Sequence, residues 1–195
     1  MEREDRLTSE QGRYLIDVAR KTIEKALRKT PAEPDSSGGR PDAGLFHVRR
    51  GTFVTLTRDG QLRGCIGHIA AQAPLIESVR ENALSAAFRD PRFRPLSADE
   101  LDRIAIEVSI LTEPQPLAYT DAADLLAKLR PGVDGLIIKK GYHQATFLPQ
   151  VWEQLPRKEE FLTNLCLKAG LDPEAWRKGD LEVLTYQVQA FEEES

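Results

Sequence analysis

Asp59-Gly60 constrains the fold more than any other feature of the sequence. The pair is a strong signal for a two-residue hairpin turn, because both central positions of such a turn need a backbone conformation that Asp and Gly tolerate. Phe53 to Thr57, before the turn, is rich in Thr, Val and Phe, and Gln61 to Ile66 forms the return strand. We therefore expect an antiparallel hairpin, which does not fit a doubly wound parallel sheet.

Helical and extended patterns alternate along the rest of the chain. Helical spacing predicts helices over Thr8 to Lys29, after Pro74 and before Pro91, over Asp121 to Leu129, over Lys158 to Ala169, and a short one starting at Asp172-Pro173. Strands are predicted over Arg103 to Leu111, Gly135 to Lys139, Ala145 to Leu148 and Leu181 to Phe191. The mixture predicts an α+β fold, a largely antiparallel sheet with flanking helices. Segment 30–44, with three Pro and three Gly, is predicted to be a flexible loop.

Composition excludes several classes of protein. The chain has 195 residues, 41% of them hydrophobic and 30% charged, which is typical of a globular protein that buries its own core. The formal net charge of -4 argues against bulk attraction to nucleic acid or to an anionic membrane. Two cysteines that stand far apart are no disulfide framework. With no signal peptide and no apolar run of about 20 residues, we expect a cytoplasmic protein without a membrane segment.

Cys65 is the first candidate for chemistry. It stands between Gly64 and Gly67, and a glycine within a strand often marks the close approach of another backbone or a ligand. In an extended strand Arg63 and Cys65 point to the same face, where a guanidinium would favour the thiolate over the thiol. The alternative is that Cys65 is a small buried hydrophobe. Cys166, on the apolar stripe of its helix, is expected to belong to the core.

The second candidate is segment 88–95, which holds three arginines and two phenylalanines. Its arginines, Arg89 and Arg92 among them, suit a carboxylate or phosphate held by forked hydrogen bonds. Interleaved Arg and Phe also suit stacking on a nucleic-acid base. The alternative is an ordered loop in which Asp90 pairs with a nearby arginine and Phe93 fills the core.

Cofactor motifs are missing from the sequence. The three histidines are scattered, no CxxC motif exists, and neither a P-loop nor GxGxxG nor GxSxG occurs. We therefore expect no metal and no cofactor. Two roles remain for Glu107, on the polar side of an otherwise apolar strand: a general base, or a solvated or arginine-paired carboxylate.

The hexapeptide Leu62-Arg63-Gly64-Cys65-Ile66-Gly67 resembles the hallmark of the AMME chromosomal region gene 1 protein family, whose bacterial and archaeal members are called AmmeMemoRadiSam system protein A. Five further segments resemble the family's other blocks in order, at 87–93, 106–111, 132–136, 146–152 and 161–171. The match covers residues 8–191, which we expect to be a single domain of this type.

This resemblance implies an α+β fold of two intimately packed subdomains, with a cleft near the hexapeptide. It also implies two partners, a Memo-like protein and a radical SAM protein, whose genes tend to accompany those of the family. No activity is firmly attached to the family. Both an enzymatic role for the motif cysteine and a regulatory, nucleic-acid-linked role have been supposed.

The leading hypothesis is an accessory protein of a Memo/radical SAM system that uses Cys65 as a reactive thiol or covalent carrier. Supporting roles would fall to Arg63, stabilising the thiolate or orienting an anionic substrate, to backbone N–H groups around Gly64 and Gly67, holding an oxyanion, and to Arg89 and Arg92, binding a negative group, with Asp90 as a further candidate binding residue. The alternative is a module without chemistry, which binds RNA, a nucleotide or another protein and in which Cys65 is structural. Whether the chain is an enzyme stays open.

Overall fold

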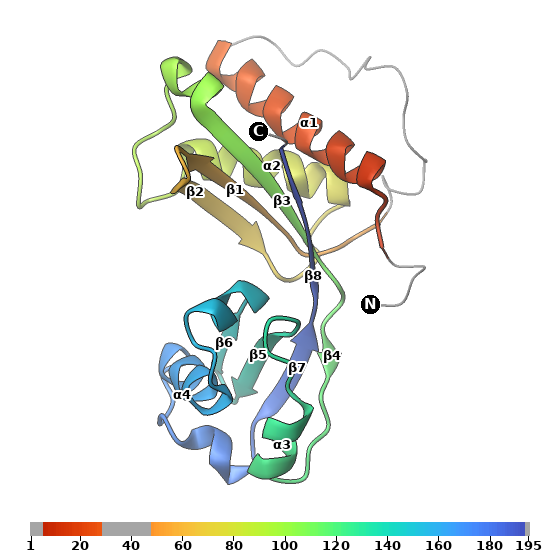
Figure 1. Cartoon of the computed structure of the whole chain (residues 1–195), viewed down its shortest axis with the longest axis vertical. Helices are drawn as coiled ribbons and strands as arrows, with labels where there is room; N and C mark the ends of the chain where they lie inside the picture. Colours follow the sequence, from red (N-terminus) through yellow and green to blue (C-terminus); the bar gives the residue numbers. More distant parts are fainter. Residues whose placement is uncertain (1–5, 29–47, 194–195) are drawn as a thin grey trace. The chain divides into compact units, whose positions relative to one another are not determined.

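The computed structural model describes residues 6–28 and 48–193, so the predicted loop 30–44 lies outside the described residues. The chain divides into two compact units (Figure 1). The first runs to Leu111 and resumes at Gln189, and the second consists of Thr112–Val188. The second unit is therefore an insertion in the sequence of the first. The single domain over residues 8–191 stays a prediction.

The first unit contains the predicted hairpin and a four-stranded sheet in the order β2-β1-β3-β8. Its elements are α1 (Ser9–Arg28), β1 (Thr52–Arg58), β2 (Gln61–His68), α2 (Leu75–Phe88), η3 (Ala98–Arg103), β3 (Ile104–Leu111) and β8 (Val188–Glu192). Strand β1 pairs antiparallel with both β2 and β3. At the turn, Asp59 and Gly60 have φ values of 52° and 75°, which confirms the hairpin signal.

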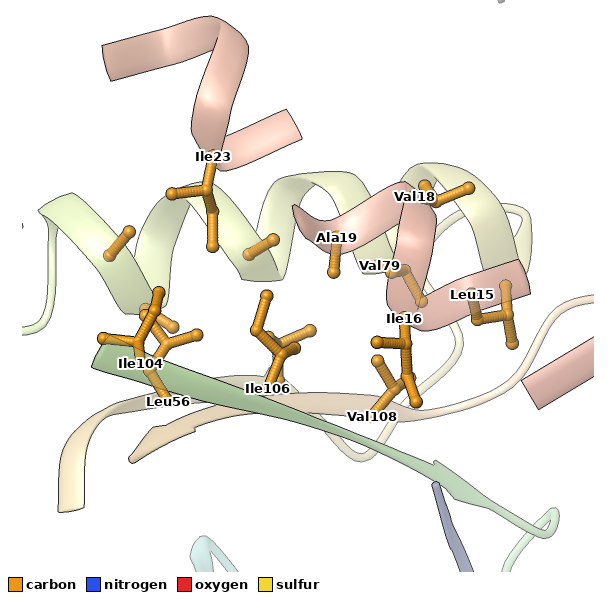
Figure 2. Packing of buried hydrophobic residues seen from close by; sticks show 14 of the residues in the cluster. Leu15, Ile16, Val18, Ala19, Ile23, Leu56, Val79, Ile104, Ile106 and Val108 are labelled. Atoms are coloured by element: carbon orange, nitrogen blue, oxygen red, sulfur yellow. The ribbon is translucent and has the colours of Figure 1, made fainter. Parts of the chain in front are cut away.

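Two helices cover one face of this sheet (Figure 2). Residues three and four apart on α1 are buried, and so are alternate residues of the strands, because helix and strand side chains repeat with periods of 3.6 and 2. Figure 2 shows α1 and α2 above the strands, with the buried side chains of Leu15, Ile16, Ala19, Ile23, Val79, Leu56, Ile104, Ile106 and Val108 between them. The alternate side chains of the same strands therefore lie on the other face, and we call it the second face of the sheet.

The second unit has its own sheet, in the order β4-β7-β5-β6, and its own core. Its elements are β4 (Gln115–Pro116), α3 (Ala122–Lys128), β5 (Gly135–Lys140), β6 (His143–Phe147), η4 (Pro149–Glu153), α4 (Lys158–Lys168), η5 (Ala175–Lys178) and β7 (Glu182–Tyr186). The ring of Trp152 stacks on that of Phe161 at a centroid distance of 3.6 Å. Gly170 follows α4 with a φ of 73°, as a glycine after a helix commonly does.

The fold class is confirmed as α+β, with two antiparallel sheets where the sequence suggested one. The single last strand predicted over Leu181 to Phe191 is wrong, because the strand is interrupted at Gln187. There the backbone N–H of Gln187 donates to Thr112 Oγ1, and its carbonyl accepts from the N–H of Thr112. Strand β7 thus completes the second sheet and β8 the first.

The short helix expected to start at Asp172-Pro173 begins later, at Ala175. Asp172 does not cap it directly. Instead Oδ1 of Asp172 accepts a hydrogen bond from the N–H of Glu174, two residues on, at 2.8 Å. This local turn is typical of aspartate, and it delays the helix by three residues.

Candidate functional site

A β-bulge interrupts β2 at Arg63, inside the hexapeptide of residues 62–67. Gly64 pairs with Leu56 of β1, whereas Leu62 pairs with Thr57, so Arg63 has no partner residue across the ladder. The simple alternation from which we predicted the face of Arg63 does not extend through a bulge. The sequence shows no sign of this extra residue.

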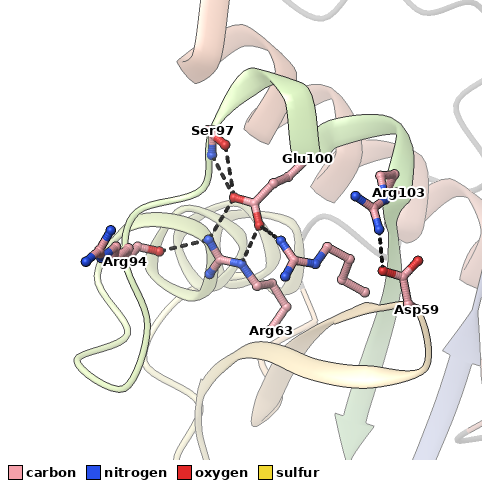
Figure 3. A network of polar contacts seen from close by, with 7 residues as sticks. Asp59, Arg63, Arg94, Ser97, Glu100 and Arg103 are labelled. Atoms are coloured by element: carbon pink, nitrogen blue, oxygen red, sulfur yellow. Dashed lines mark hydrogen bonds and ion pairs between the residues drawn. The ribbon is translucent and has the colours of Figure 1, made fainter.

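The guanidinium of Arg63 is held by Glu100, at the start of η3. Nε and Nη2 of Arg63 each donate to one carboxylate oxygen at 2.9 Å, and Nη2 also donates to the carbonyl of Arg94 at 2.9 Å (Figure 3). Glu100 in turn accepts from the backbone N–H and the hydroxyl of Ser97, and it pairs with Arg58. The hydrogen bonds from Arg63 lower the pKa of Glu100 to about 2 against the opposing effect of burial. Arg63 therefore fastens the loop before β3 onto β2.

An ion pair holds the backbone of Cys65. The N–H of Cys65 donates to Oδ2 of Asp90 at 2.9 Å, and Nη2 of Arg92 donates to the carbonyl of Cys65 at 3.2 Å. Arg92 also binds both carboxylate oxygens of Asp90, at 3.0 and 2.7 Å. The hydrogen bonds from Arg92 hold the pKa of the buried Asp90 well below its usual range. Because β2 is an edge strand, this pair occupies backbone groups that a further strand would otherwise take.

Gly64 and Gly67 mark close approaches by the protein itself. A Cβ atom at Gly64 would lie 2.2 Å from the carbonyl oxygen of Ala86 in α2. A Cβ at Gly67 would lie 2.4 Å from ring atoms of Phe53 and 2.2 Å from the carbonyl oxygen of Thr52. Both glycines thus have a packing role. Holding an oxyanion with the N–H groups around them stays a prediction, and the N–H of Cys65 is already bound.

Cys65 belongs to a row of polar side chains that crosses the second face of the sheet. Its neighbour on β1 is Thr55, whose Oγ1 donates to the sulfur at 3.3 Å. Across β1 and β3, Thr55 pairs with Glu107. Cys65 is partly exposed, as are Thr55 and Glu107. A thiol, a hydroxyl and a carboxyl group therefore follow one another on three adjacent strands.

The row continues onto β8. A hydrogen bond of 3.0 Å from the N–H of Glu193 to the carbonyl of Ile106 sets the register, so Glu192 stands beside Glu107. The hydroxyl of Ser109 donates to Oε1 of Glu107 at 2.7 Å. Burial raises the pKa of Glu107; the hydrogen bond from Ser109 opposes this and Glu192 adds to it. We call Cys65, Thr55, Glu107 and Glu192 the cross-strand row.

The remaining residues of segment 88–95 lie around this site. Arg89 and Arg94 are exposed, and within the described residues their side chains form no ion pair. Phe88 packs against the core of the first unit. Phe93 lies beneath the guanidinium of Arg92, 5.5 Å from the ring centroid. The two aromatic rings thus contact other parts of the protein, whereas the side chains of Arg89 and Arg94 form no ion pair with the described residues.

Sequence reasoning did not find Thr55 or Glu192. Neither stands in a recognisable motif, and each enters the site only through strand pairing. The one available signal was the hairpin turn, which fixes β1 opposite β2 and so brings Thr55 close to the motif cysteine.

Helices that could cross a bilayer, by length and apolar composition, are absent from residues 6–28 and 48–193. The same residues include no group of three or more His, Cys, Asp or Glu side chains arranged to hold a metal ion. His68 is exposed at the end of β2.

Known proteins share this architecture over nearly the whole chain. The AMMECR1 family model matches residues 16–191. A protein of Methanothermobacter thermautotrophicus is 44% identical over 195 residues, covering 96% of this chain and 97% of that relative. A protein of Methanocaldococcus jannaschii is 40% identical over 194 residues, covering 96% and 92% of the two chains. The crystal structure of an uncharacterised protein of Pyrococcus horikoshii superposes with a TM-score of 0.83 at 36% identity, covering 96% of this chain and 94% of that one.

Proposed function

The chain belongs to the AMMECR1 family, and we propose that it is a reactive-thiol protein whose Cys65 forms a covalent bond with an electrophilic substrate. The observation that carries the proposal is the hydrogen bond from the Thr55 hydroxyl to the Cys65 sulfur, on a partly exposed position of the sheet. A hydroxyl that donates to sulfur stabilises the charged thiolate more than the neutral thiol. The thiolate is the nucleophilic form of cysteine.

The surroundings of Cys65 favour a fixed nucleophile. Asp90 and Arg92 bind its N–H and its carbonyl, and Gly64, next to it, lies against the backbone of α2. Backbone restraint on both sides holds Cys65 in place while the residue stays partly exposed. Rigid elements are better supports for reacting groups than mobile loops are.

Alkylation with iodoacetamide tests the proposal directly. In this reaction the sulfur forms a bond to carbon, iodide leaves with the electron pair of the carbon–iodine bond, and the thiol proton passes to a base. We expect mass spectrometry to find Cys65 modified in the native protein. Cys166 is the internal control, because it is fully buried and burial raises the pKa of its thiol. If Cys65 is protected until denaturation, as Cys166 should be, the proposal is wrong.

The partners belong to the same proposal. We infer that the chain acts as an accessory protein to a Memo-like protein and a radical SAM protein, and the support for this is the family resemblance. The test mixes the three purified proteins from one organism and follows the mass of this chain. A new adduct on the native chain that is missing from Cys65→Ser would support the inference. Complete absence of binding and of any adduct would overturn it.

Binding of RNA or a nucleotide without chemistry is the second candidate, favoured by Arg89 and Arg94, which are exposed and form no ion pair with any described residue. Phosphate contacts release counterions, so affinity for a single-stranded RNA probe should fall steeply as salt is raised. The double variant Arg89→Ala/Arg94→Ala should weaken that binding, and Cys65→Ser should not. Binding that is insensitive to both salt and the arginine substitutions would exclude this candidate.

A further inference from the structure

We propose that Glu107 is the acid–base group of the Cys65 site, that it shares one proton with Glu192, and that it exchanges protons with the sulfur through the Thr55 hydroxyl. This inference rests on the proposed function, since it assigns the proton of the Cys65 thiol. No sequence motif marks Thr55 or Glu192. The inference comes from the cross-strand row.

The path from the sulfur of Cys65 to the carboxyl group of Glu107 leads through Thr55. Directly paired residues on adjacent antiparallel strands have Cβ atoms about 4.5–5.5 Å apart, and Thr55 is paired with both Cys65 and Glu107. Its hydroxyl already lies 3.3 Å from the sulfur. In the structure this hydroxyl donates to the sulfur, and after rotation towards Glu107 it can accept the thiol proton while it releases its own. Thr55 thus stands where a relay between Cys65 and Glu107 has to stand.

The carboxyl groups of Glu107 and Glu192 share one proton. Two ionised carboxylates have only acceptor atoms, so Glu107 and Glu192, neighbours on adjacent strands, can hydrogen-bond to each other only when one of them carries a proton. Partial burial favours the neutral form of Glu107, and so does the neighbouring charge of Glu192. Ser109 donates to one oxygen of Glu107 and orients it. At rest the pair therefore carries one proton and one negative charge.

The proton transfer leaves the net charge of the cross-strand row unchanged. When the sulfur attacks, its proton passes to the Thr55 oxygen, the hydroxyl proton of Thr55 passes to Glu107, and the proton that Glu107 already holds moves on to Glu192. The carboxyl pair is then neutral, and the negative charge has moved to the sulfur. No second charge is created on the sheet, so the transfer avoids the repulsion that two like charges would cost. The pair afterwards returns the proton to the departing group and regains its charge.

Few other titratable groups face the pair. From β2 the facing group is Cys65, and from β8 it is Glu192. Asp90 and Arg92 bind each other and the backbone of Cys65. The helices α1 and α2 pack on the opposite face of the sheet. A change in the titration of Glu107 can therefore be assigned to its partners in the row.

The shared proton is tested without any reaction of Cys65. Carboxyl ¹³C NMR of the full chain labelled at glutamate, with Glu107→Gln and Glu192→Gln for assignment, gives the titration curve of each group. We expect two coupled steps in the native chain, and in Glu192→Gln we expect the pKa of Glu107 to move towards its ordinary value. Titration of Glu107 that is unaffected by Glu192→Gln would overturn the shared proton.

The proton transfer is tested by the alkylation rate of Cys65 against pH. The native chain should react at a rate that is nearly independent of pH around neutrality, because the proton moves within the protein. Glu107→Gln should slow the reaction about tenfold there, and Thr55→Val about threefold or more, whereas Thr55→Ser should retain the native rate. Above about pH 10 solvent ionises a thiol unaided, so all variants should converge.

Glu182→Gln is the matched control, because Glu182 is an exposed strand glutamate of the second unit that pairs with Lys139. It should leave the whole profile unchanged. Native rates at neutral pH in Glu107→Gln would refute Glu107 as the acid–base group, while a reactive Cys65 would leave the proposed function standing. Conversely, a protected Cys65 removes the proposed function, and the NMR titration still decides whether the carboxyl pair exists.

Discussion

The two cysteines of this chain lie in opposite kinds of environment. Cys166 is fully buried on α4, where Phe161, Leu162 and Leu165 belong to the same apolar cluster. Cys65 is partly exposed on β2, with a hydroxyl at its sulfur and an ion pair at its backbone. Apolar packing fixes the first residue, and polar contacts and a close backbone approach fix the second.

The contrast shows how the same type of side chain can be either a buried core residue or a positioned, accessible thiol. Burial in an apolar core raises the pKa of the Cys166 thiol and keeps it inert. Around Cys65 the restraints act on the backbone, so the sulfur is held in place while it stays reachable. A protein that needs a positioned thiol has to stabilise the residue through atoms other than the sulfur.

The largest effect on stability is expected from a substitution that disrupts the close approach of α2 to the backbone beside Cys65. Gly64→Ala would place a Cβ atom 2.2 Å from the carbonyl oxygen of Ala86, and a backbone atom cannot move aside easily. We expect a loss of about 3 kcal/mol or more in the free energy of unfolding. Hydrogen exchange measured by mass spectrometry should show the loss of protection in α2 and β2.

Gly132→Ala is the control for this substitution. Gly132 has a φ of 75° and no atom within 4 Å of the added Cβ, so only backbone strain of about 1 kcal/mol is expected. Equal destabilisation by the two substitutions would contradict the close approach of α2 to the sheet.

The next effect concerns the ion pair that secures Arg63. The lowered pKa of Glu100 means that its contribution to stability is complete above its unfolded value of 4.5 and is lost as pH falls towards about 2. Glu100→Gln should therefore cost about 3 kcal/mol at pH 7, and the difference from the native chain should shrink below pH 4.5. Urea unfolding at a series of pH values measures this. A difference that does not change with pH would contradict the ion pair.

A smaller effect on stability is expected when each of the two cysteines is replaced by serine. Cys166→Ser places a hydroxyl in an apolar core and should cost about 2 kcal/mol. Cys65→Ser keeps a hydrogen-bonding atom beside Thr55 and should cost less than about 0.5 kcal/mol. Equilibrium unfolding of both variants gives the comparison, and a reversed order would show that we have assigned the two environments wrongly.

The smallest effect is expected for Glu107, whose substitution should change the stability at pH 7 in the opposite direction to that of Glu100. The pKa of Glu107 is raised, so the folded chain loses stability as pH rises from the unfolded value of 4.5 through the folded value. Glu107→Gln removes this loss and keeps the acceptor for Ser109, so it should slightly stabilise the protein at pH 7 and have no such benefit at pH 4. Thermal unfolding at the two pH values decides the sign, with Glu182→Gln as the control.

Local signals predicted much of the fold. The turn at Asp59-Gly60 and the helix that ends before Pro91 are both present, because each depends on residues close together in the sequence. The family resemblance likewise rests on contiguous blocks, and the family match over residues 16–191 confirms it.

The site was harder to predict, because its parts meet through register and strand order. If the pairing of β1 with β2 continued from the turn without a bulge, Thr55 would pair with Gly64. Because of the bulge at Arg63, Thr55 pairs with Cys65 instead. The partner of Arg63 is Glu100, 37 positions away, which no spacing rule indicates. A single strand was predicted where β7 and β8 separate, since alternation cannot say which sheet a strand joins.

The insertion of the second unit between β3 and β8 has a consequence for synthesis on the ribosome. Strands β1, β2 and β3 emerge early, but the sheet lacks its fourth strand until all of Thr112–Val188 has been made. Since chains are made at about 5–20 residues per second, the thiol emerges seconds before its most distant carboxyl partner. A nascent chain therefore exposes Cys65 without Glu192, and the complete cross-strand row marks a chain translated through the whole inserted unit.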